Sequence, residues 1–181
     1  MKFRAVLVLA ATCLAGCGDV VSTEPLVGRG DAIYDAALLG TWFDQDNSVF
    51  TVTSPKPPEY DILYVVADKG ERYWIKGRLM QMGELKVLDV TDDRTGPFSL
   101  PVHAWASLER KGNGWEIRFL DSNWFQNKVR MSQHPYFIVD NSPVLTASTA
   151  RLQELVRESG LSPEARSEAM VLLPFRKPSG Q

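Results

Sequence analysis

The sequence predicts a mainly β domain in which one antiparallel sheet closes into a β-barrel, with two or three short α-helices late in the chain. At least seven short β-type runs follow residue 40, and turn residues separate them at hairpin spacing. Several runs alternate apolar and polar side chains, as half-buried strands do; residues 60–66 and 115–119 are the clearest examples. Consecutive hairpins favour a single sheet that bends onto itself as a barrel or, alternatively, as a sandwich.

The first 16 residues have the pattern of a secretory signal peptide. Lys2 and Arg4 supply the positive start, and the apolar run over residues 5–14 is too short for a spanning helix, which needs about 20 residues. The run ends in Leu14-Ala15-Gly16-Cys17, which resembles the lipobox of bacterial lipoproteins. The resemblance implies that the sulfur of Cys17 receives a diacylglycerol, that the leader is cleaved before it, and that the new amine is acylated.

The anchor predicts where the protein resides. In lipoproteins of enteric type, an Asp directly after the lipidated cysteine favours the inner membrane, whereas this chain has Gly18 there. The expected location is the periplasmic side of the outer membrane; the alternatives are the outer leaflet of the inner membrane and the cell surface. Cys13 leaves with the leader and Cys17 carries lipid, so the mature domain has no disulfide.

Composition places the rest of the chain among ordinary globular domains, with 44% hydrophobic and 23% charged residues. Loss of Lys2 and Arg4 with the leader lowers the basic count from 20 to 18 against 22 acidic residues, a formal charge of −4. That balance offers no surface for nucleic acid. The expected organisation is a signal peptide (1–16), a flexible lipid-anchored tether (17–31), a single β-rich domain (32–177) and a tail (178–181), because residues 18–31 are polar and turn-prone.

Within the domain, the first expected element is a short helix over residues 32–39, with Asp31 as N-cap and Gly40 just past its end. The clearest hairpin turn is Lys111-Gly112-Asn113-Gly114, and the proline-rich stretch 54–58 is expected to be a loop. Expected strands cover residues 41–44, 49–53, 60–67, 72–79, 85–90, 102–110, 115–120, 136–139 and 171–175.

Helical patterns appear only after the main strands. A short amphipathic segment follows Asp121, and a further turn or two is expected after Ser162. The best helix is preceded by Ser148, begins at Thr149 and ends at Ser159. It carries three aliphatic side chains on one face, Leu152, Leu155 and Val156.

Gly40-Thr41-Trp42, after a short helix and at the start of the first strand, resembles the Gly-x-Trp signature of the lipocalin and calycin families. The resemblance implies that Trp42 packs across the closed end of the barrel with an arginine over its ring. Arg176 is the position that fits, through a cation–π contact of about 1 kcal/mol. Trp42 is alternatively an ordinary core aromatic. Residues 39–90 also resemble bacterial lipoproteins in which a Gly-Thr-Trp strand precedes a Leu-Asp-Val strand.

The aromatic content suggests a ligand cavity, although the same rings can simply fill a core. The ligand-binding candidates are Tyr64, Trp74, His103 and Trp105. Trp74 alternates with the cations Arg72, Lys76 and Arg78 on one strand face, which either binds an anionic glycan or nucleotide or is a solvated surface.

Catalytic and metal motifs are weak. The two histidines, His103 and His134, have no His-x-His or His-Glu-x-x-His spacing, so no metal centre and no cofactor are expected. His103 shares a strand face with Ser107 and Glu109, but such neighbours point in parallel, and no Gly-x-Ser-x-Gly elbow supports a triad. Asp89 lies in an apolar run; it either needs a buried partner or ends its strand and caps the next turn.

The sequence therefore predicts a membrane-anchored, non-catalytic module that binds a small apolar ligand or an envelope component, with no catalytic residue. One alternative is an envelope hydrolase that uses His103 with a carboxylate. The other is a structural partner of envelope proteins.

Overall fold

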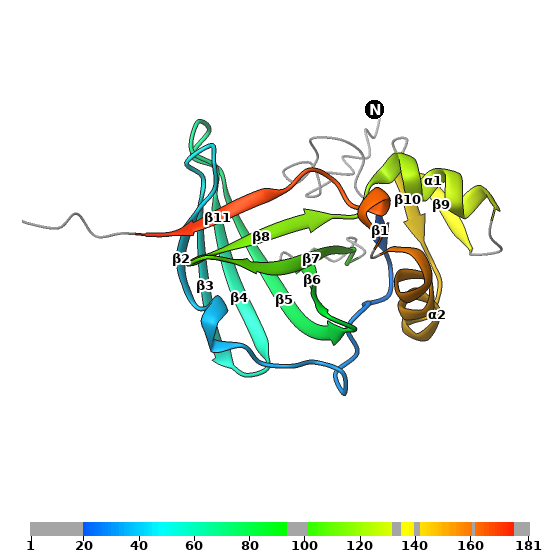
Figure 1. Ribbon diagram of the computed structural model, residues 1–181, viewed down its shortest axis with the longest axis horizontal. Coiled ribbons are helices and arrows are strands. Elements are labelled where there is room, and N and C mark those ends of the chain that lie inside the picture. The colour runs from blue at the N-terminus through cyan, green and yellow to red at the C-terminus, as the bar shows by residue number, and fades with distance from the viewer. Residues whose placement is uncertain (1–19, 94–100, 132–134, 140–141, 161, 176–181) are drawn as a thin grey trace, which may run out of the picture.

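The computed structural model describes residues 20–93, 101–131, 135–139, 142–160 and 162–175 (Figure 1). The predicted signal peptide, Cys17, His134, Arg176 and the predicted tail 178–181 lie outside the described residues.

Eight antiparallel strands form a closed barrel and follow one another around it in chain order. Each pairs with the next, the last strand returns to pair with the first, and β6 pairs with β7 to complete the circuit. The strands are β2 (Gly40–Phe43), β3 (Val49–Lys56), β4 (Glu59–Val65), β5 (Arg72–Met82), β6 (Leu85–Asp92), β7 (His103–Lys111), β8 (Gly114–Phe119) and β11 (Met170–Pro174). This is the arrangement of up-and-down barrels, so the predicted barrel is confirmed and the sandwich alternative is wrong.

Alternation along the strands places one side-chain set in the barrel. Phe50, Tyr60 and Ile62 point inward from β3 and β4, as do Trp115 and Ile117 from β8, and all five are buried. The tight turns between strands use left-handed backbone: Gly112 has φ 61° in the β7–β8 hairpin, and Asn47 has φ 62° between β2 and β3. The predicted hairpins thus set the strand order.

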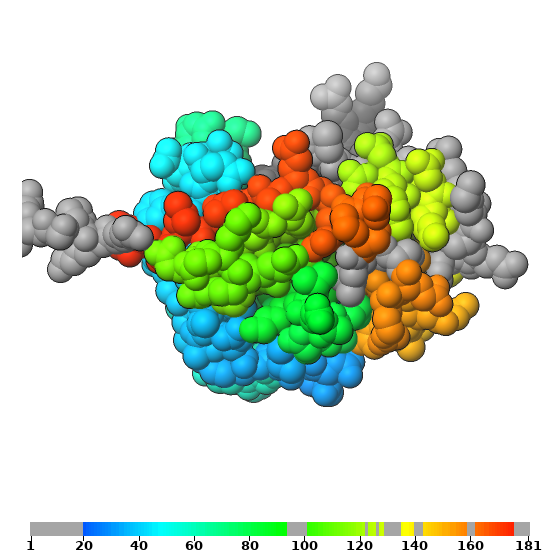
Figure 2. All heavy atoms as spheres, viewed as in Figure 1, coloured from blue at the N-terminus to red at the C-terminus, as the bar shows by residue number. Residues whose placement is uncertain are grey.

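A second layer covers one side of the barrel (Figure 1). It contains β1 (Val21–Ser22), β9 (Tyr136–Val139) and β10 (Ser142–Leu145), the helices α1 (Ser122–Met131) and α2 (Thr149–Leu155), the π-helical turn η3 (Val156–Gly160) and the 3₁₀ turn η4 (Pro163–Ala165). β1 pairs antiparallel with the start of β7 and parallel with β10, and β9 pairs with β10. Figure 2 shows atoms of α1 and of the residues that follow α2 gathered at this end of the molecule. The prediction of two or three short helices is confirmed.

The protein therefore has two hydrophobic cores. One is the barrel interior, and the other lies between the outer face of β5–β7 and the second layer. Met80, Met82 and Trp105 point outward from the barrel into this second core, where Phe125 of α1 and Leu152 of α2 meet them.

The expectation of a flexible tether over residues 17–31 is wrong for the described part. Val20, Val21, Leu26 and Val27 are at most 8% exposed, and Val21 belongs to β1. These four side chains occur as two pairs among turn residues, so the stretch as a whole is polar and does not look like part of a core. Burying each of them nevertheless stabilises the fold by about 1.5–3 kcal/mol. The domain thus begins at or before Val20, only three residues after Cys17.

The predicted helix over residues 32–39 is also wrong in extent. Only the 3₁₀ turn η2 (Ala36–Leu38) forms, and its N-cap is Asp35, whose carboxylate accepts a hydrogen bond from Ala37 N at 2.9 Å. Ile33 instead forms a bridge with Leu79 of β5. This bridge holds the residues before η2 extended against the barrel.

Candidate functional site

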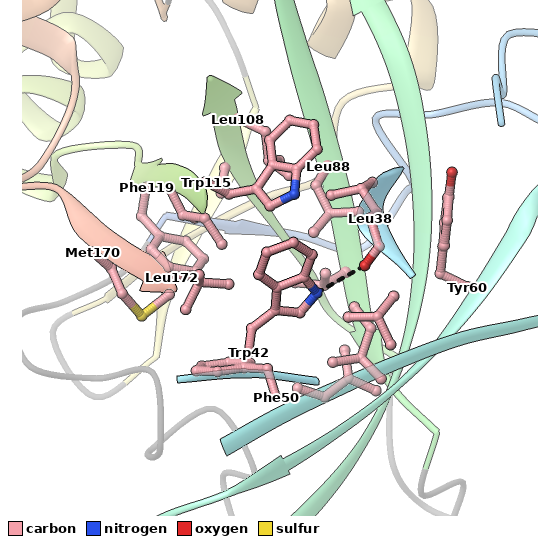
Figure 3. A pocket seen from close by; sticks show the side chains of 16 residues that line it. Leu38, Trp42, Phe50, Tyr60, Leu88, Leu108, Trp115, Phe119, Met170 and Leu172 are labelled. Carbon is pink, nitrogen blue, oxygen red and sulfur yellow. Dashed lines mark hydrogen bonds between the residues drawn. The ribbon is translucent and has the colours of Figure 1, made fainter. Parts of the chain in front are cut away.

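The barrel interior contains a narrow cavity of about 60 Å³ (Figure 3). Sixteen side chains from η2 and all eight barrel strands line it, and its wall is almost entirely carbon. A buried water needs roughly two to four polar partners, which this wall does not supply, so the cavity suits an apolar group. An apolar cavity of about 150 Å³ accepts benzene, and this lumen has less than half of that volume.

One end of the lumen is sealed by η2. Asp35 N donates a hydrogen bond to Tyr60 Oη at 2.6 Å, and Trp42 Nε1 donates to Leu38 O at 2.9 Å. Trp115 Nε1 donates to Ala37 O at 3.3 Å. These bonds tie the 3₁₀ turn to the inward-facing side chains of three strands, β2, β4 and β8 (Figure 3 shows the Trp42 bond). The β2–β3 and β4–β5 turns lie at the opposite end of the barrel.

Electrostatics strengthen this seal. Lys86 Nζ forms an ion pair with the Asp35 carboxylate. Burial alone would raise the pKa of Asp35, but the hydrogen bonds from Lys86 and Ala37 N and the charges of Lys86 and Arg110 outweigh it, so the pKa lies below its ordinary value. Burial likewise raises the pKa of Tyr60, whose hydroxyl stays neutral and able to donate.

Among the described residues, two cations lie against the ring of Trp115. The Arg110 guanidinium lies 4.9 Å from its centroid and Lys86 Nζ lies 5.6 Å from it. Trp42 is buried in the lumen wall, as the lipocalin resemblance implies, but the Arg176 contact falls outside the described residues. Sequence reasoning missed Trp115, although Arg110 and Trp115 flank the clearest hairpin and therefore pair directly across it.

The four ligand-binding candidates from the sequence do not line the cavity. Tyr64 stacks on Phe50 with ring centroids 4.3 Å apart, beside the lumen residues. Trp74 is 54% exposed on the outer wall, and Trp105 is buried in the second core. His103 also points outward, and it is opposite Ser22 of the neighbouring strand β1. The true lumen residues are mostly aliphatic, and the alternation of their strands was the available signal.

The cation stripe on β5 is a solvated surface. Lys76 Nζ pairs with Asp61 at 2.7 Å, and Arg78 Nη2 pairs with Glu59 at 2.8 Å. These cations therefore neutralise carboxylates of the neighbouring strand β4, and surface pairs of this kind contribute about 0–1 kcal/mol.

Asp89 and His103 form a buried pair on the outer face of β6 and β7. His103 Nδ1 lies 2.8 Å from Asp89 Oδ1, and Val27 N donates to Asp89 Oδ2 at 2.9 Å. Asp89 is 4% exposed, so the expectation that it needs a buried partner is confirmed. The alternative, in which it ends its strand, is wrong, because β6 continues to Asp92. The pair fastens the N-terminal segment to the barrel.

The set of His103, Ser107 and Glu109 drawn from the sequence is not assembled. Ser107 Oγ donates to Arg118 O at 3.4 Å, and Glu109 pairs with Arg166 at 2.6 Å. Among the described residues there is no group of three His, Cys, Asp or Glu side chains that could hold a metal ion. Within the same residues, no helix has both the length and the apolar character needed to span a bilayer.

Replacing Asp89 tests this anchoring role. Asp89→Ala leaves Val27 N and His103 without their acceptor, and we expect a loss of about 3 kcal/mol in the free energy of unfolding, measured by urea denaturation. The matched control is Asp61→Ala on the surface of β4, which should cost no more than about 1 kcal/mol. Equal losses in the two variants would contradict a structural role for the buried pair.

The low pKa of Asp35 predicts a pH-dependent contribution to stability. A carboxyl group whose pKa is lowered by folding stabilises the fold at pH values above its pKa in the unfolded chain, 3.8. This contribution is lost as the pH falls through the pKa of the folded state. Asp35→Asn should therefore be less stable than the parent at pH 7, and the difference should shrink below about pH 4. Urea midpoints between pH 7 and 2.5 measure it, and a difference that does not change with pH would refute the ion pair.

Comparison with protein-family models, curated proteins and solved structures finds no match to this chain. The functional argument therefore follows from the geometry of its own residues.

Proposed function

We propose that this chain is a lipid-anchored module of the bacterial envelope whose barrel lumen binds one slender apolar group, such as a single alkyl chain. The observation that carries the proposal is the cavity of about 60 Å³, which has an almost entirely apolar wall and is closed at one end by η2. A close-packed core has few voids larger than a water molecule, so an apolar channel of this size that is sealed at one end favours a ligand over mere packing.

The shape of the lumen restricts the ligand class. Phe50, Trp115 and Phe119 contribute aromatic rings to the cavity wall, and no charged side chain lines it. A charged or strongly polar group would lose its hydration there without gaining a partner, which costs several kcal/mol. The polar end of an amphiphile therefore stays outside the lumen, and only its hydrocarbon enters.

The proposed lipid anchor also favours a lipid-derived ligand. The lipobox-like Leu14-Ala15-Gly16-Cys17 predicts a chain that begins at an acylated cysteine, and the first buried residue, Val20, follows almost at once. A module held beside a bilayer meets lipids and their fragments at high local concentration. The outer membrane, on its periplasmic side, is the location that Gly18 favours.

The hydrolase alternative has one observation in its favour, the hydrogen bond between His103 and Asp89. His103 is only 14% exposed, and Asp89 also receives Val27 N, so the pair lies beneath the N-terminal segment rather than in a cleft open to substrate. The geometry therefore supports binding over catalysis.

Filling the lumen tests the proposal. Ala106→Leu adds three carbons to the cavity wall, and we expect it to abolish binding of a fluorescent single-chain alkyl probe that the parent protein binds with a blue-shifted emission. Val52→Leu, a smaller change on the same wall, should weaken binding if Ala106→Leu fails to fold.

The control is Trp74→Ala, which removes a sequence-derived ligand candidate from the outer wall and should leave binding unchanged. Near-ultraviolet circular dichroism verifies that each variant is folded. Binding that survives folded lumen-filling variants, or that disappears with Trp74→Ala, would overturn the lumen as the site.

A further inference from the structure

We infer that strand β9 is a membrane-contact surface, and that Tyr136, Phe137 and Ile138 enter the interfacial layer of a zwitterionic phospholipid bilayer. This inference rests on the proposed lipid anchor and adds an orientation: the edge of the second layer, rather than the barrel, faces the membrane.

The first step is the short length of chain between Cys17 and the folded domain. Val20 is 2% exposed and packs in the second core, so the chain is held by the fold from that residue onward. Only Gly18 and Asp19 separate it from Cys17. Three extended residues span at most about 11 Å, so an acylated Cys17 holds this part of the domain against the headgroups. A domain on a long tether would have no such preferred face.

The second step is the register of the second layer. Val21 of β1 pairs with Val144 of β10, and Val144 pairs with Phe137 of β9. Neighbouring strands lie about 4.8 Å apart, so β9 is roughly 10 Å from β1. Figure 1 shows β9 and β10 together with β1 and α1 at one end of the molecule. Strand β9 is therefore on the part of the domain that the short segment after Cys17 holds near the bilayer.

The third step is the chemistry of β9. Its first three side chains are consecutive, large and apolar or aromatic, and they are 40%, 41% and 54% exposed. β9 is also the last strand of the sheet order in the described residues, and it carries no charge to protect that edge. Tyrosine and other aromatic side chains favour the membrane–water interface, where an apolar body and a polar tip are both accommodated.

Charge identifies the lipid class. The mature chain has a formal charge of −4, so attraction to anionic headgroups does not drive the contact. Apolar insertion into a zwitterionic surface remains as the source of affinity. A second copy of this chain could also cover an exposed edge strand, and the experiment below separates that outcome.

The experiment places a reporter on β9 of the full acylated protein. Cys13 leaves with the leader and Cys17 carries lipid, so Ile138→Cys introduces the sole free thiol, which is labelled with an environment-sensitive fluorophore. The matched control is Leu173→Cys: Leu173 is also aliphatic and 54% exposed, but it lies near the end of β11, on the opposite side of the molecule in Figure 1. Both proteins are reconstituted into phosphatidylcholine vesicles that contain a nitroxide-labelled phosphatidylcholine quencher.

We expect a blue shift and strong quenching of the label at position 138, and neither at position 173. Several results would overturn the inference. Equal quenching at both positions would mean that the label itself partitions. An unquenched label at 138 would refute the contact, and label–label quenching that grows with protein density would assign β9 to a second copy.

Intact mass of the same samples separates this inference from the proposed function. If Cys17 is acylated and position 138 stays aqueous, the orientation is wrong and the anchor stands. If no acyl mass is present, the proposed anchor is wrong. The orientation is then wrong as well, because it depends on a short segment between an acylated Cys17 and Val20.

Discussion

The structure depends on the burial of strand β7 on both faces. Its inward face carries Ala104, Ala106 and Leu108, the last two of which line the cavity, while Trp105 on its outward face is covered by the second core. β7 also closes the barrel through β6, whose buried Asp89 receives both His103 and Val27 N. One strand pair therefore connects barrel closure, the cavity and the placement of the N-terminal segment, so the lumen and the segment from Val20 to Val27 are held together by packing and by the Val27–Asp89 hydrogen bond.

Much of the barrel could be predicted from local pattern, because hairpin turns and period-two alternation are properties of neighbouring residues. The Gly112 and Asn47 turns and the inward face of β8 are examples. The N-terminal part of the second layer could not be predicted in this way. Val27 contacts Asp89 across 62 residues, and no local signal distinguishes a valine in a tether from one that covers a barrel. The buried β1 was therefore mistaken for linker.

The candidate site was also predictable only where neighbouring residues determine it, and not where it depends on distant parts of the chain. The two faces of a strand such as 103–111 alternate, but only knowledge of what covers the outer face says which side meets a ligand. Trp105 was a reasonable ligand candidate as an aromatic on the polar face, and the helices that bury it come from residues 122–155. Aromatic content pointed toward a ligand-binding barrel, but the cavity wall itself is mostly aliphatic.

We propose that a lipid on Cys17 holds, beside the membrane, a barrel that carries an apolar ligand. Mass spectrometry of the protein extracted from its native membrane in mild detergent tests it most directly. Under denaturing conditions the account predicts a chain that begins at Cys17 and carries diacylglycerol and fatty acyl mass; under native conditions it predicts a co-purifying small apolar molecule that is released on unfolding. A chain with an unmodified thiol at Cys17, or an acylated chain whose native and denatured masses agree, would contradict it.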